Sequence, residues 1–352
     1  MRIAQIAPLF EAVPPKLYGG TERVVYSLTE ALVEMGHDVT LFASGDSTTS
    51  ARLDAPWPRS LRLDPDIRDW VATYTLMVEY VRQRSDQFDV LHFHIDYWPN
   101  SVFIRQEVPF VTTLHGRLDL PEFAAVYRMF PTVKLVSISD NQRTPLPDVG
   151  WAATVYHGMP ANLLTPQPAD NRDYFAFLGR ISPEKGIERA IQIAGRCGVK
   201  LKVAAKVDKA DAEYFKHSVE PLLADANVEF IGEINDAQKP AFLSGAKALL
   251  FPIDWPEPFG LVMIEAMACG CPVIAMRRGS VPEVMDDGVT GFVVDNVDEA
   301  VAACGRLHEI DRAGVRAQFD KRFTSRRMAA DYVTLYERLI AARKPQLRAV
   351  GG

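Results

Sequence analysis

Two charged segments in the second half of the sequence combine residue types that could bind phosphate and hydroxyl groups. Arg180 and Lys185 flank a turn in FLGRISPEKGIERA, where the planar guanidinium and the compact ammonium together could hold a diphosphate. Glu257 and Glu265 lie in DWPEPFGLVMIEAMACG, and their carboxylates could accept paired hydrogen bonds from vicinal hydroxyls. The two cations predict a site that stabilises negative charge on a departing diphosphate, although a solvated helix start is the alternative for their segment. The two carboxylates predict binding of a hydroxylated ligand.

Backbone N–H groups at two predicted helix starts offer a second kind of contact. In LYGGTERVVYSL, Gly19 and Gly20 precede Thr21, a good N-cap residue, and Glu22 is expected to open the helix. The N–H groups of a first helical turn carry partial positive charge and bind phosphate or a hydroxyl group. A tight turn without any ligand is an equally good interpretation of the glycine pair. Similar N–H donors are expected at residues 259–261, near the start of a second helix.

These residues must be positioned by elements that alternate between strand and helix along the whole chain. Short continuous runs of Val, Ile, Leu and Phe, such as RIAQIAPLF and VLHFHI, alternate with amphipathic stretches such as TERVVYSLTEALVEMG. Such runs are typical of parallel strands covered by helices on both faces. A segment rich in Pro, Asn and Asp at 159–173 interrupts the pattern, and the same rhythm then resumes.

The pattern predicts an α/β protein with two doubly wound, Rossmann-like domains that face each other across a cleft. We expect a first domain at 1–165, a second domain at 166–325, and a segment at 326–352 whose helix packs back across the linker. The length of 352 residues agrees, because one hydrophobic core rarely grows beyond about 250–300 residues. Ligands of such sheets bind outside the carboxyl ends of the strands, which confines the search to those loops.

Composition and charge exclude several classes of function. The chain has 39 Lys and Arg against 45 Asp and Glu, and the net charge of −6 opposes non-specific binding to nucleic acid. The four cysteines fit neither a disulfide framework nor a structural zinc site, so we expect reduced thiols in a cytoplasmic protein. We expect no secretory signal and no transmembrane segment, while the sequence leaves peripheral contact with a membrane open.

Two further patterns resemble metal ligands and are interpreted otherwise. His92 and His94 alternate in VLHFHID, as two ligands on one face of a strand would, but no third ligand is evident in the sequence. Asp64-Pro65-Asp66 resembles an Asp-x-Asp metal motif, but a Pro directly after Asp and ahead of IRDWVATYTLMVEYV predicts a helix start. We therefore predict no metal site.

Three motifs, in this order along the chain, resemble those of one enzyme family. The segments YGGTERVV, GRISPEKG and EPFGLVMIEAMACGCPVIA resemble the retaining family-four glycosyltransferases of GT-B fold, and the resemblance covers nearly the whole chain. It implies that a hexose moves from a nucleotide diphosphate sugar to a small-molecule or glycan acceptor with its anomeric configuration kept. It also implies that neither a metal nor a further cofactor is required. UDP-glucose is the expected donor.

The resemblance implies that the two cations bind the donor diphosphate, while Glu257 positions the donor hexose without attacking it and Glu265 binds the ribose hydroxyls. Gly20 would approach the diphosphate from the other domain, and His115, in FVTTLHG, would hydrogen-bond the donor sugar. The catalytic set implied in this way is His115, Arg180, Lys185 and Glu257. The donor-binding set is Gly19, Gly20, Phe259, Gly260, Leu261 and Glu265.

Two parts of the predicted site are less well specified by the sequence than the donor-binding motifs. They are the loop after LKVA, on the nucleotide side, and the acceptor site. After LKVA the family usually has a small Ala-Gly turn, whereas this chain has Lys206, either a third cation near the phosphates or a solvated side chain. Loops of the first domain are expected to bind the acceptor. The candidate residues are Asp96, Tyr97, Trp98, Arg117 and Asp119. Aromatic residues there could stack on a ring, although packing is their commoner role.

Three narrower or competing functions stay open. The segments LYGGTERVV and HFHIDY resemble enzymes described as pteridine glucosyltransferases, which would specify the acceptor class. A UDP-sugar epimerase shares the two-domain fold and the nucleotide site, but it would epimerise the donor without an acceptor. A non-catalytic module would bind a sugar nucleotide without turnover. The sequence lacks the motifs that define dehydrogenases, P-loop NTPases and α/β-hydrolases.

Overall fold

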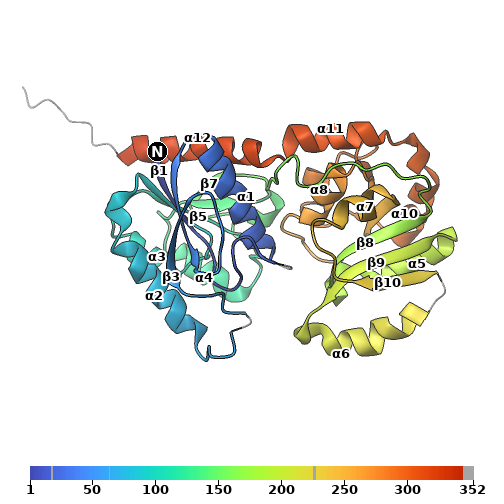
Figure 1. The fold of residues 1–352 in the computed structure, drawn as a ribbon, viewed down its shortest axis with the longest axis horizontal. Helices are drawn as coiled ribbons and strands as arrows, with labels where there is room; N and C mark the ends of the chain where they lie inside the picture. The colour runs from blue at the N-terminus through green and yellow to red at the C-terminus, as the bar shows by residue number, and fades with distance from the viewer. Residues whose placement is uncertain (17–18, 63, 225–226, 344–352) are drawn as a thin grey trace, which may run out of the picture. The chain divides into compact units, whose positions relative to one another are not determined.

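The computed structural model describes residues 1–16, 19–62, 64–224 and 227–343, which divide into two compact units (Figure 1). Unit 1 comprises Met1–Ile138, Arg143–Gly158 and the chain from Ser325 onward, and unit 2 comprises Ser139–Gln142 and Met159–Thr324. The units thus change at 158/159 and 324/325, whereas the sequence predicted limits at 165/166 and 325/326. Residues 344–352 of the predicted last segment lie outside the described residues.

Unit 1 is built on a seven-stranded parallel sheet in the order β3-β2-β1-β4-β5-β6-β7. Its strands are β1 (Arg2–Ile6), β2 (Asp38–Ser44), β3 (Arg52–Trp57), β4 (Val90–Phe93), β5 (Phe110–Thr113), β6 (Leu135–Ser137) and β7 (Trp151–Thr154). The chain winds outward from β1 to β3 and then continues on the other side of β1, so its direction reverses between β1 and β4. This is the strand order of a Rossmann fold, whose ligands bind at that reversal.

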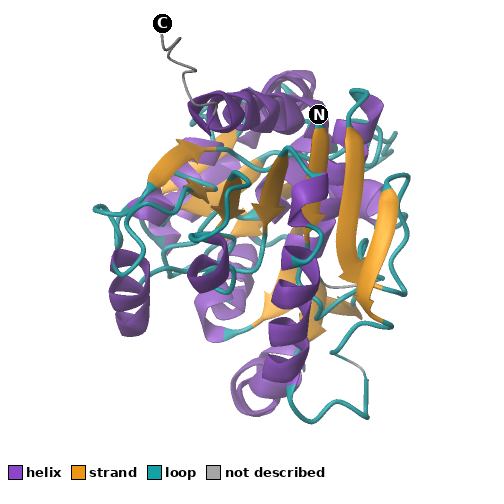
Figure 2. Ribbon diagram, turned by 90° about the vertical axis from the view of Figure 1, so that its left-hand side faces the viewer, coloured by secondary structure: helices purple, strands orange, loops and turns teal. Residues whose placement is uncertain are grey.

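Helices flank the strands of unit 1, as Figure 2 shows. They are α1 (Gly20–Glu34), α2 (Trp70–Arg82), α3 (Asn100–Phe103), α4 (Pro121–Arg128) and α12 (Ser325–Arg343). The long helix α12 packs against α1 and β4. It buries Tyr332 and Tyr336, so the last described helix covers part of a sheet whose first strand begins at Arg2.

Unit 2 repeats this arrangement with a six-stranded parallel sheet in the order β10-β9-β8-β11-β12-β13. Its strands are β8 (Tyr174–Ile181), β9 (Lys200–Val207), β10 (Val228–Gly232), β11 (Ala246–Phe251), β12 (Val273–Met276) and β13 (Gly291–Val294). Its helices are α5 (Ile187–Cys197), α6 (Ala212–Tyr214), α7 (Lys239–Ser244), α8 (Leu261–Ala268), α9 (Val281–Val284), α10 (Val297–Gly305) and α11 (Arg312–Arg322). Winding reverses between β8 and β11, and the predicted α/β class with two doubly wound, Rossmann-like domains is confirmed.

Burial explains the composition of the central strands. Every residue of β4, β12 and β13 is buried. Strands covered by helices on both faces need apolar side chains on both faces, which is the continuous pattern that the sequence contains. Polar residues in such strands, including Gln5, His92 and Thr113, are removed from water and need hydrogen-bond partners inside the protein.

The first helix begins one residue earlier than its predicted cap. Gly20 is the first residue of α1 and Gly19 occupies the cap position, so Thr21 lies inside the first turn and is not the N-cap. A methyl group on Gly19 would lie 2.7 Å from Cβ of Pro15, closer than carbon atoms pack. The glycine is therefore needed for the close packing of the β1–α1 loop.

The helix after β3 begins later than the Asp64-Pro65 pair predicted. The first residue of α2 is Trp70, and the carboxylate of Asp69 accepts hydrogen bonds from the N–H groups of Val71 and Ala72. Asp69 is thus the N-cap, because a carboxylate there satisfies N–H groups that have no partner within the helix.

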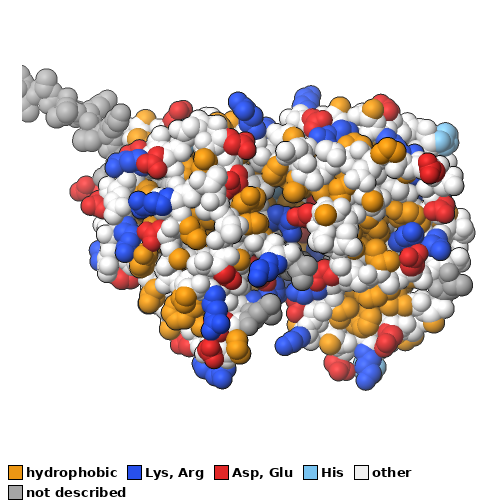
Figure 3. All heavy atoms as spheres, in the orientation of Figure 1, with side chains coloured by type: hydrophobic (Ala, Val, Ile, Leu, Met, Phe, Trp, Pro, Cys, Tyr) orange, Lys and Arg blue, Asp and Glu red, His pale blue; other side chains and the backbone are white. Residues whose placement is uncertain are grey.

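Two features of the described residues concern their surroundings: the length and polarity of the helices, and the distribution of charge on the surface. In the described part of the chain, no helix is both long and apolar enough to cross a lipid bilayer. On the face drawn in Figure 3, acidic and basic side chains are interspersed over both units. This mixture agrees with the small net charge of −6.

Candidate functional site

The predicted cation and carboxylate of unit 2 meet where the winding of its sheet reverses. Lys185 lies in a 3-10 turn (Pro183–Lys185) that follows β8, and Glu257 lies in the loop that follows β11. Lys185 Nζ donates to Glu257 Oε2 at 2.5 Å. β8 and β11 are neighbours in the sheet, so the carboxyl ends of both strands deliver these loops to one place.

Trp255 completes this contact, although the sequence analysis did not single it out. Its Nε1–H donates to Glu257 Oε2 at 3.0 Å, and the ammonium of Lys185 lies 4.8 Å from the centre of its ring. An ammonium over an aromatic face is attracted by the ring quadrupole. The indole therefore orients both the cation and the carboxylate. Trp255 could have been singled out in the sequence, because it is an aromatic residue in a Pro-rich loop that follows a predicted strand.

A 3-10 turn separates β8 from the next helix, and α5 begins at Ile187. Gly186 joins the two with a φ of 71°, and a methyl group there would collide with the carbonyl oxygen of Pro252. This close approach holds the turn that carries Lys185 against the end of β11.

Gly279 and Ser280, which follow β12, fix the backbone of the Glu257 loop. The N–H of Ser280 donates to the carbonyl oxygen of Glu257 at 2.9 Å, and Ser280 Oγ donates to that of Phe259 at 2.8 Å. Gly279 has a φ of 55°, and a methyl group on it would collide with the backbone of Glu257. The loop conformation thus depends on residues that sequence reasoning did not name.

Arg180 lies near the end of β8, on the strand side of the turn as predicted, and two carboxylates hold its guanidinium. Its Nη2 donates to Glu184 Oε1 at 2.8 Å, and its Nε lies 3.6 Å from Asp211 Oδ2. Lys206 occupies the adjacent register position on β9, and its Nζ lies 3.8 Å from Asp208 Oδ2. Two cations thus lie side by side at the carboxyl ends of β8 and β9.

The second predicted carboxylate, Glu265, is buried inside α8 and pairs with a cation that the sequence analysis missed. Lys239 Nζ donates to Glu265 Oε1 at 2.7 Å and lies 3.2 Å from Asp236 Oδ1. Glu265 is 5% exposed and Lys239 is 8% exposed, so solvent does little to screen either charge. The sequence signal was weak, because Lys239 stands in NDAQKPAF, where a basic residue is usually solvated.

The predicted backbone donors lie at the start of α8. Gly260 is the cap residue with a φ of 79°, and Leu261 is the first residue of the helix. N–H groups in a first helical turn can bind a ligand, although the N–H of Met263 here already donates to the carbonyl oxygen of Gly260 at 3.0 Å. Phe259 is buried, and its carbonyl oxygen accepts from Ser280. Its side chain therefore packs in the interior instead of lining a surface.

In unit 1, His115 follows β5 and belongs to a group of close imidazole rings. Its Nε2 lies 2.8 Å from Nδ1 of His94, and its ring stacks on His157 with centroids 5.2 Å apart. Burial lowers the pKa of His115 to about 3, which keeps the ring neutral near neutral pH. Its Nδ1 is buried, and within the described ranges no hydrogen-bond partner reaches that atom.

The histidines around His115 are expected to stay neutral in mild acid. Burial lowers the pKa of His92, His94 and His157 well below the usual value near 6.5. The unfolded chain binds these protons and the folded chain does not, so each ring costs about 1.4 kcal/mol of unfolding free energy per pH unit below about 6.5. We expect their ring-proton NMR resonances to stay constant from about pH 8 to about pH 5.

Titration of any of the three buried rings between about pH 8 and about pH 5 would contradict the neutral assignment.

The predicted acceptor residues after β4 divide into a packed ring and an exposed one. Trp98 contacts both Trp70 and Tyr74, with ring centroids 5.8 Å and 5.4 Å away, and packs on the core of unit 1. Tyr97 stacks on Trp98 at 6.3 Å with an interplanar angle of 18°, and it is 37% exposed. Tyr97 therefore offers a ring face to solvent, whereas Trp98 supports it from below.

The charged acceptor candidates have local roles. Arg117 donates to both carboxylate oxygens of Asp119, at 2.6 Å and 2.8 Å, and these hydrogen bonds lower the pKa of Asp119. Asp96 is exposed and has a φ of 50°, a left-handed backbone that residues other than glycine seldom adopt. Such strain at a strand end is found most often at binding sites, which keeps Asp96 a candidate.

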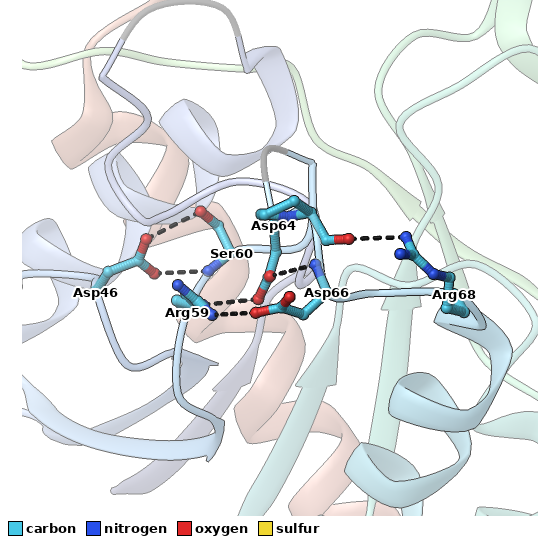
Figure 4. A network of polar contacts seen from close by, with 7 residues as sticks. Asp46, Arg59, Ser60, Asp64, Asp66 and Arg68 are labelled. Carbon is cyan, nitrogen blue, oxygen red and sulfur yellow. Dashed lines mark hydrogen bonds and ion pairs between the residues drawn. The ribbon is translucent and has the colours of Figure 1, made fainter.

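The Asp64-Pro65-Asp66 motif is held by an arginine, as Figure 4 shows. Arg59 Nε donates to Asp64 Oδ2 at 2.7 Å, and its Nη2 donates to Asp66 Oδ2 at 3.0 Å. Asp64 Oδ1 also accepts from the N–H of Asp66 at 3.0 Å. The two carboxylates therefore order this surface loop by pairing with the guanidinium.

Comparisons with known proteins agree with this arrangement. A model described as Glycosyltransferase Family 4 matches residues 18–141, and a model described as Glycosyl transferases group 1 matches residues 165–320. The phosphatidyl-myo-inositol mannosyltransferase of Mycolicibacterium smegmatis is 28% identical, over 92% of this chain and 89% of its own length.

Solved structures of GT-B glycosyltransferases share the fold. The sucrose-phosphate synthase of Thermosynechococcus elongatus superposes with a TM-score of 0.77 and 21% identity, over 97% of this chain and 99% of its own. Anabaena HepE, in complex with UDP and glucose, superposes with a TM-score of 0.74 and 17% identity, over 96% and 100% of the two chains.

Proposed function

Because the chain belongs to the family-four glycosyltransferases of GT-B fold, we propose that it moves a hexose from a nucleotide diphosphate sugar to an acceptor and retains the anomeric configuration. UDP-glucose is the proposed donor. The complex of Anabaena HepE with UDP and glucose supports this choice at the level of the fold. The acceptor is a small molecule or a glycan, and a pteridine is the narrower candidate.

One observation carries the proposal: the Lys185–Glu257 pair at the reversal between β8 and β11. As the bond between sugar and phosphate breaks, the departing diphosphate gains negative charge and the sugar gains oxocarbenium character. The ammonium of Lys185 is positioned to stabilise the first of these charges. Glu257 accepts hydrogen bonds from Lys185 and Trp255, and in the proposal it also binds hydroxyl groups of the hexose.

The remaining residues extend this role. Arg180 and Lys206, at the ends of adjacent strands, add positive charge for the diphosphate, and Glu265 is proposed to bind the ribose. His115 is proposed to contact the hexose. Side-chain cations would thus supply the charge that a divalent metal supplies in other transferases, so we propose activity that needs no metal.

A thermal-shift series with UDP-, GDP- and ADP-glucose tests the donor site. A donor present at about 100 times its Kd is expected to add about 2.7 kcal/mol to the unfolding free energy. Glucose transfer to a pteridine and to a panel of glycans, with and without EDTA, then tests the acceptor class and the metal requirement. Retention is read from the anomeric configuration of the product by NMR.

Each outcome of this series decides one point. Absence of a shift with all three donors would contradict the proposed donor site. Epimerised donor in the absence of acceptor would assign the chain as an epimerase. Tight donor binding without turnover of any acceptor would assign it as a binding module. Loss of activity in EDTA that Mg²⁺ restores would contradict the metal-independent mechanism.

A further inference from the structure

A continuous row of hydrogen bonds crosses the interior of unit 1 and ends at His115. It begins at α12, where Gln5 Nε2 donates to the hydroxyl of Tyr336 at 3.1 Å. On the other side of the same amide, Gln5 Oε1 lies 2.9 Å from His94 Nε2, and His94 Nδ1 lies 2.8 Å from His115 Nε2. Gln5 lies in β1 and His94 directly follows β4, the two strands between which the winding reverses.

A second branch leaves the same tyrosine. The Tyr336 hydroxyl lies 2.6 Å from His92 Nδ1, and His92 Nε2 lies 2.7 Å from Thr113 Oγ1. Thr113 in turn lies 2.8 Å from the hydroxyl of Tyr332. Apart from His115, which is partly exposed, all these side chains are at most 4% exposed, so water does not compete for the hydrogen bonds among them.

The chemistry of one amide fixes the direction of the whole row. A side-chain amide donates only from nitrogen and accepts only at oxygen, so Gln5 Oε1 requires the proton of His94 on Nε2. Nδ1 of His94 is then a bare acceptor, and the contact to His115 requires the proton of that ring on Nε2. The remaining nitrogen of His115, Nδ1, must therefore be unprotonated.

The opposite orientation of Gln5 would reverse every hydrogen bond in the row. His115 would then carry its proton on Nδ1, the buried atom that no partner in the described part of the chain reaches. A buried N–H without an acceptor is rarer and costlier than an acceptor without a donor. The observed orientation avoids this cost.

We infer that Gln5, His94 and Tyr336 are positioning residues that hold His115 as a hydrogen-bond acceptor at Nδ1. The partner with matching chemistry is a hydroxyl group of the hexose. Because Nδ1 is buried in this structure, hexose binding would have to uncover it before the hydroxyl could donate to this nitrogen. The inference rests on the proposed contact of His115 with the hexose. It adds that the imidazole accepts rather than donates there, and that a residue of the last helix enforces this.

The tautomer can be read directly on the unmodified protein. In ¹⁵N-histidine-labelled protein, the His115 signals are identified by their loss in His115→Ala, and the ring nitrogens differ strongly in shift when protonated and bare. We expect a bare Nδ1 and a protonated Nε2. A protonated Nδ1 would overturn the inference, whether or not the protein transfers sugar.

Two matched variants on α12 then connect the tautomer with turnover. Tyr336→Phe removes the hydroxyl that orients Gln5, so we expect a mixture of His115 tautomers and a fall in kcat of about 10-fold, the scale of one hydrogen bond. Tyr332→Phe removes the same atom one turn earlier, where it contacts Thr113, and we expect one tautomer and kcat within about twofold.

The combined results separate this inference from the proposed function. Full activity of His115→Ala would contradict the role of His115 in transfer, even with the expected tautomer in place. If His115→Ala is inactive while Tyr336→Phe keeps both the tautomer and the turnover of Tyr332→Phe, the role of His115 stands and the positioning role of Tyr336 is wrong.

Discussion

Replacing Lys185 with alanine is expected to lower kcat by about 100- to 1,000-fold, the loss that follows removal of one group that stabilises transition-state charge. The ammonium lies in the loop after β8, beside Glu257 and Trp255, where the departing diphosphate is proposed to lie. Because the charge on that group develops during the reaction, kcat should fall more than donor affinity. Steady-state kinetics with varied donor measures both quantities.

A lysine outside this site provides the matched control. Lys200 begins β9, is 50% exposed and lies 3.8 Å from Glu229, so Lys200→Ala should leave kcat within about twofold. Arg180→Ala should act in the same direction as Lys185→Ala, because Arg180 contributes to the same positive charge. Wild-type turnover in both Lys185→Ala and Arg180→Ala would rule out the assignment of the diphosphate site.

Replacing Lys239 with methionine is expected to lower the free energy of unfolding by about 3–5 kcal/mol. The substitution keeps most of the side-chain volume, but it leaves the carboxylate of Glu265 buried inside α8 without its cation. A buried charge that loses its partner retains the cost of desolvation without the attraction that offset it. Urea unfolding, with the slope checked for two-state behaviour, measures the difference.

A second substitution tests the cause of this loss. Adding Glu265→Gln to Lys239→Met removes the stranded charge, so the double variant should regain at least about 1 kcal/mol relative to the single one. If the two substitutions are simply additive, the pair does not interact as the geometry indicates. Donor binding by the double variant then shows whether Glu265 also contacts the nucleotide, since the ribose role requires its carboxylate.

Much of the fold could be predicted because strand periodicity is a local property of the sequence. The continuous apolar runs indicated parallel strands, and the loops after them contained the residues that meet in unit 2. Lys185 and Glu257 could be named because each follows a strand end, and strand ends of one sheet converge. The pairing of these two residues with each other could not be predicted, because it depends on which strands are neighbours.

What could not be predicted depends on contacts between distant parts of the sequence. The partner of Glu265 is Lys239 on another helix, and the Glu257 loop is shaped by Gly279 after the next strand. The start of α5 has a similar cause: Gly186 allows a 3-10 turn before that helix, a local detail that depends on the nearby end of β11. Spacing along the chain carries no information on such approaches.

The two histidines at the end of β4, His92 within the strand and His94 just after it, show the same limit. Their alternation placed His92 and His94 on one face of a strand, and both do lie in one buried polar row. Their partners are Tyr336 and Gln5, which stand at opposite ends of the chain. The sequence could therefore indicate that these rings share a face, but not which groups satisfy them.

The position of α12 sets the order in which the two units can finish folding during synthesis on the ribosome. The strands of unit 1 are synthesised before those of unit 2, yet the sheet of unit 1 lacks the hydroxyl that satisfies Gln5 and His92 until Tyr336 has emerged. Unit 2 is made almost entirely of the intervening chain and has all its elements before that helix exists. Nascent protein thus matures in the reverse of the usual amino-to-carboxyl direction. A premature stop codon after Thr324 would leave unit 2 with all its elements, but unit 1 would lack α12.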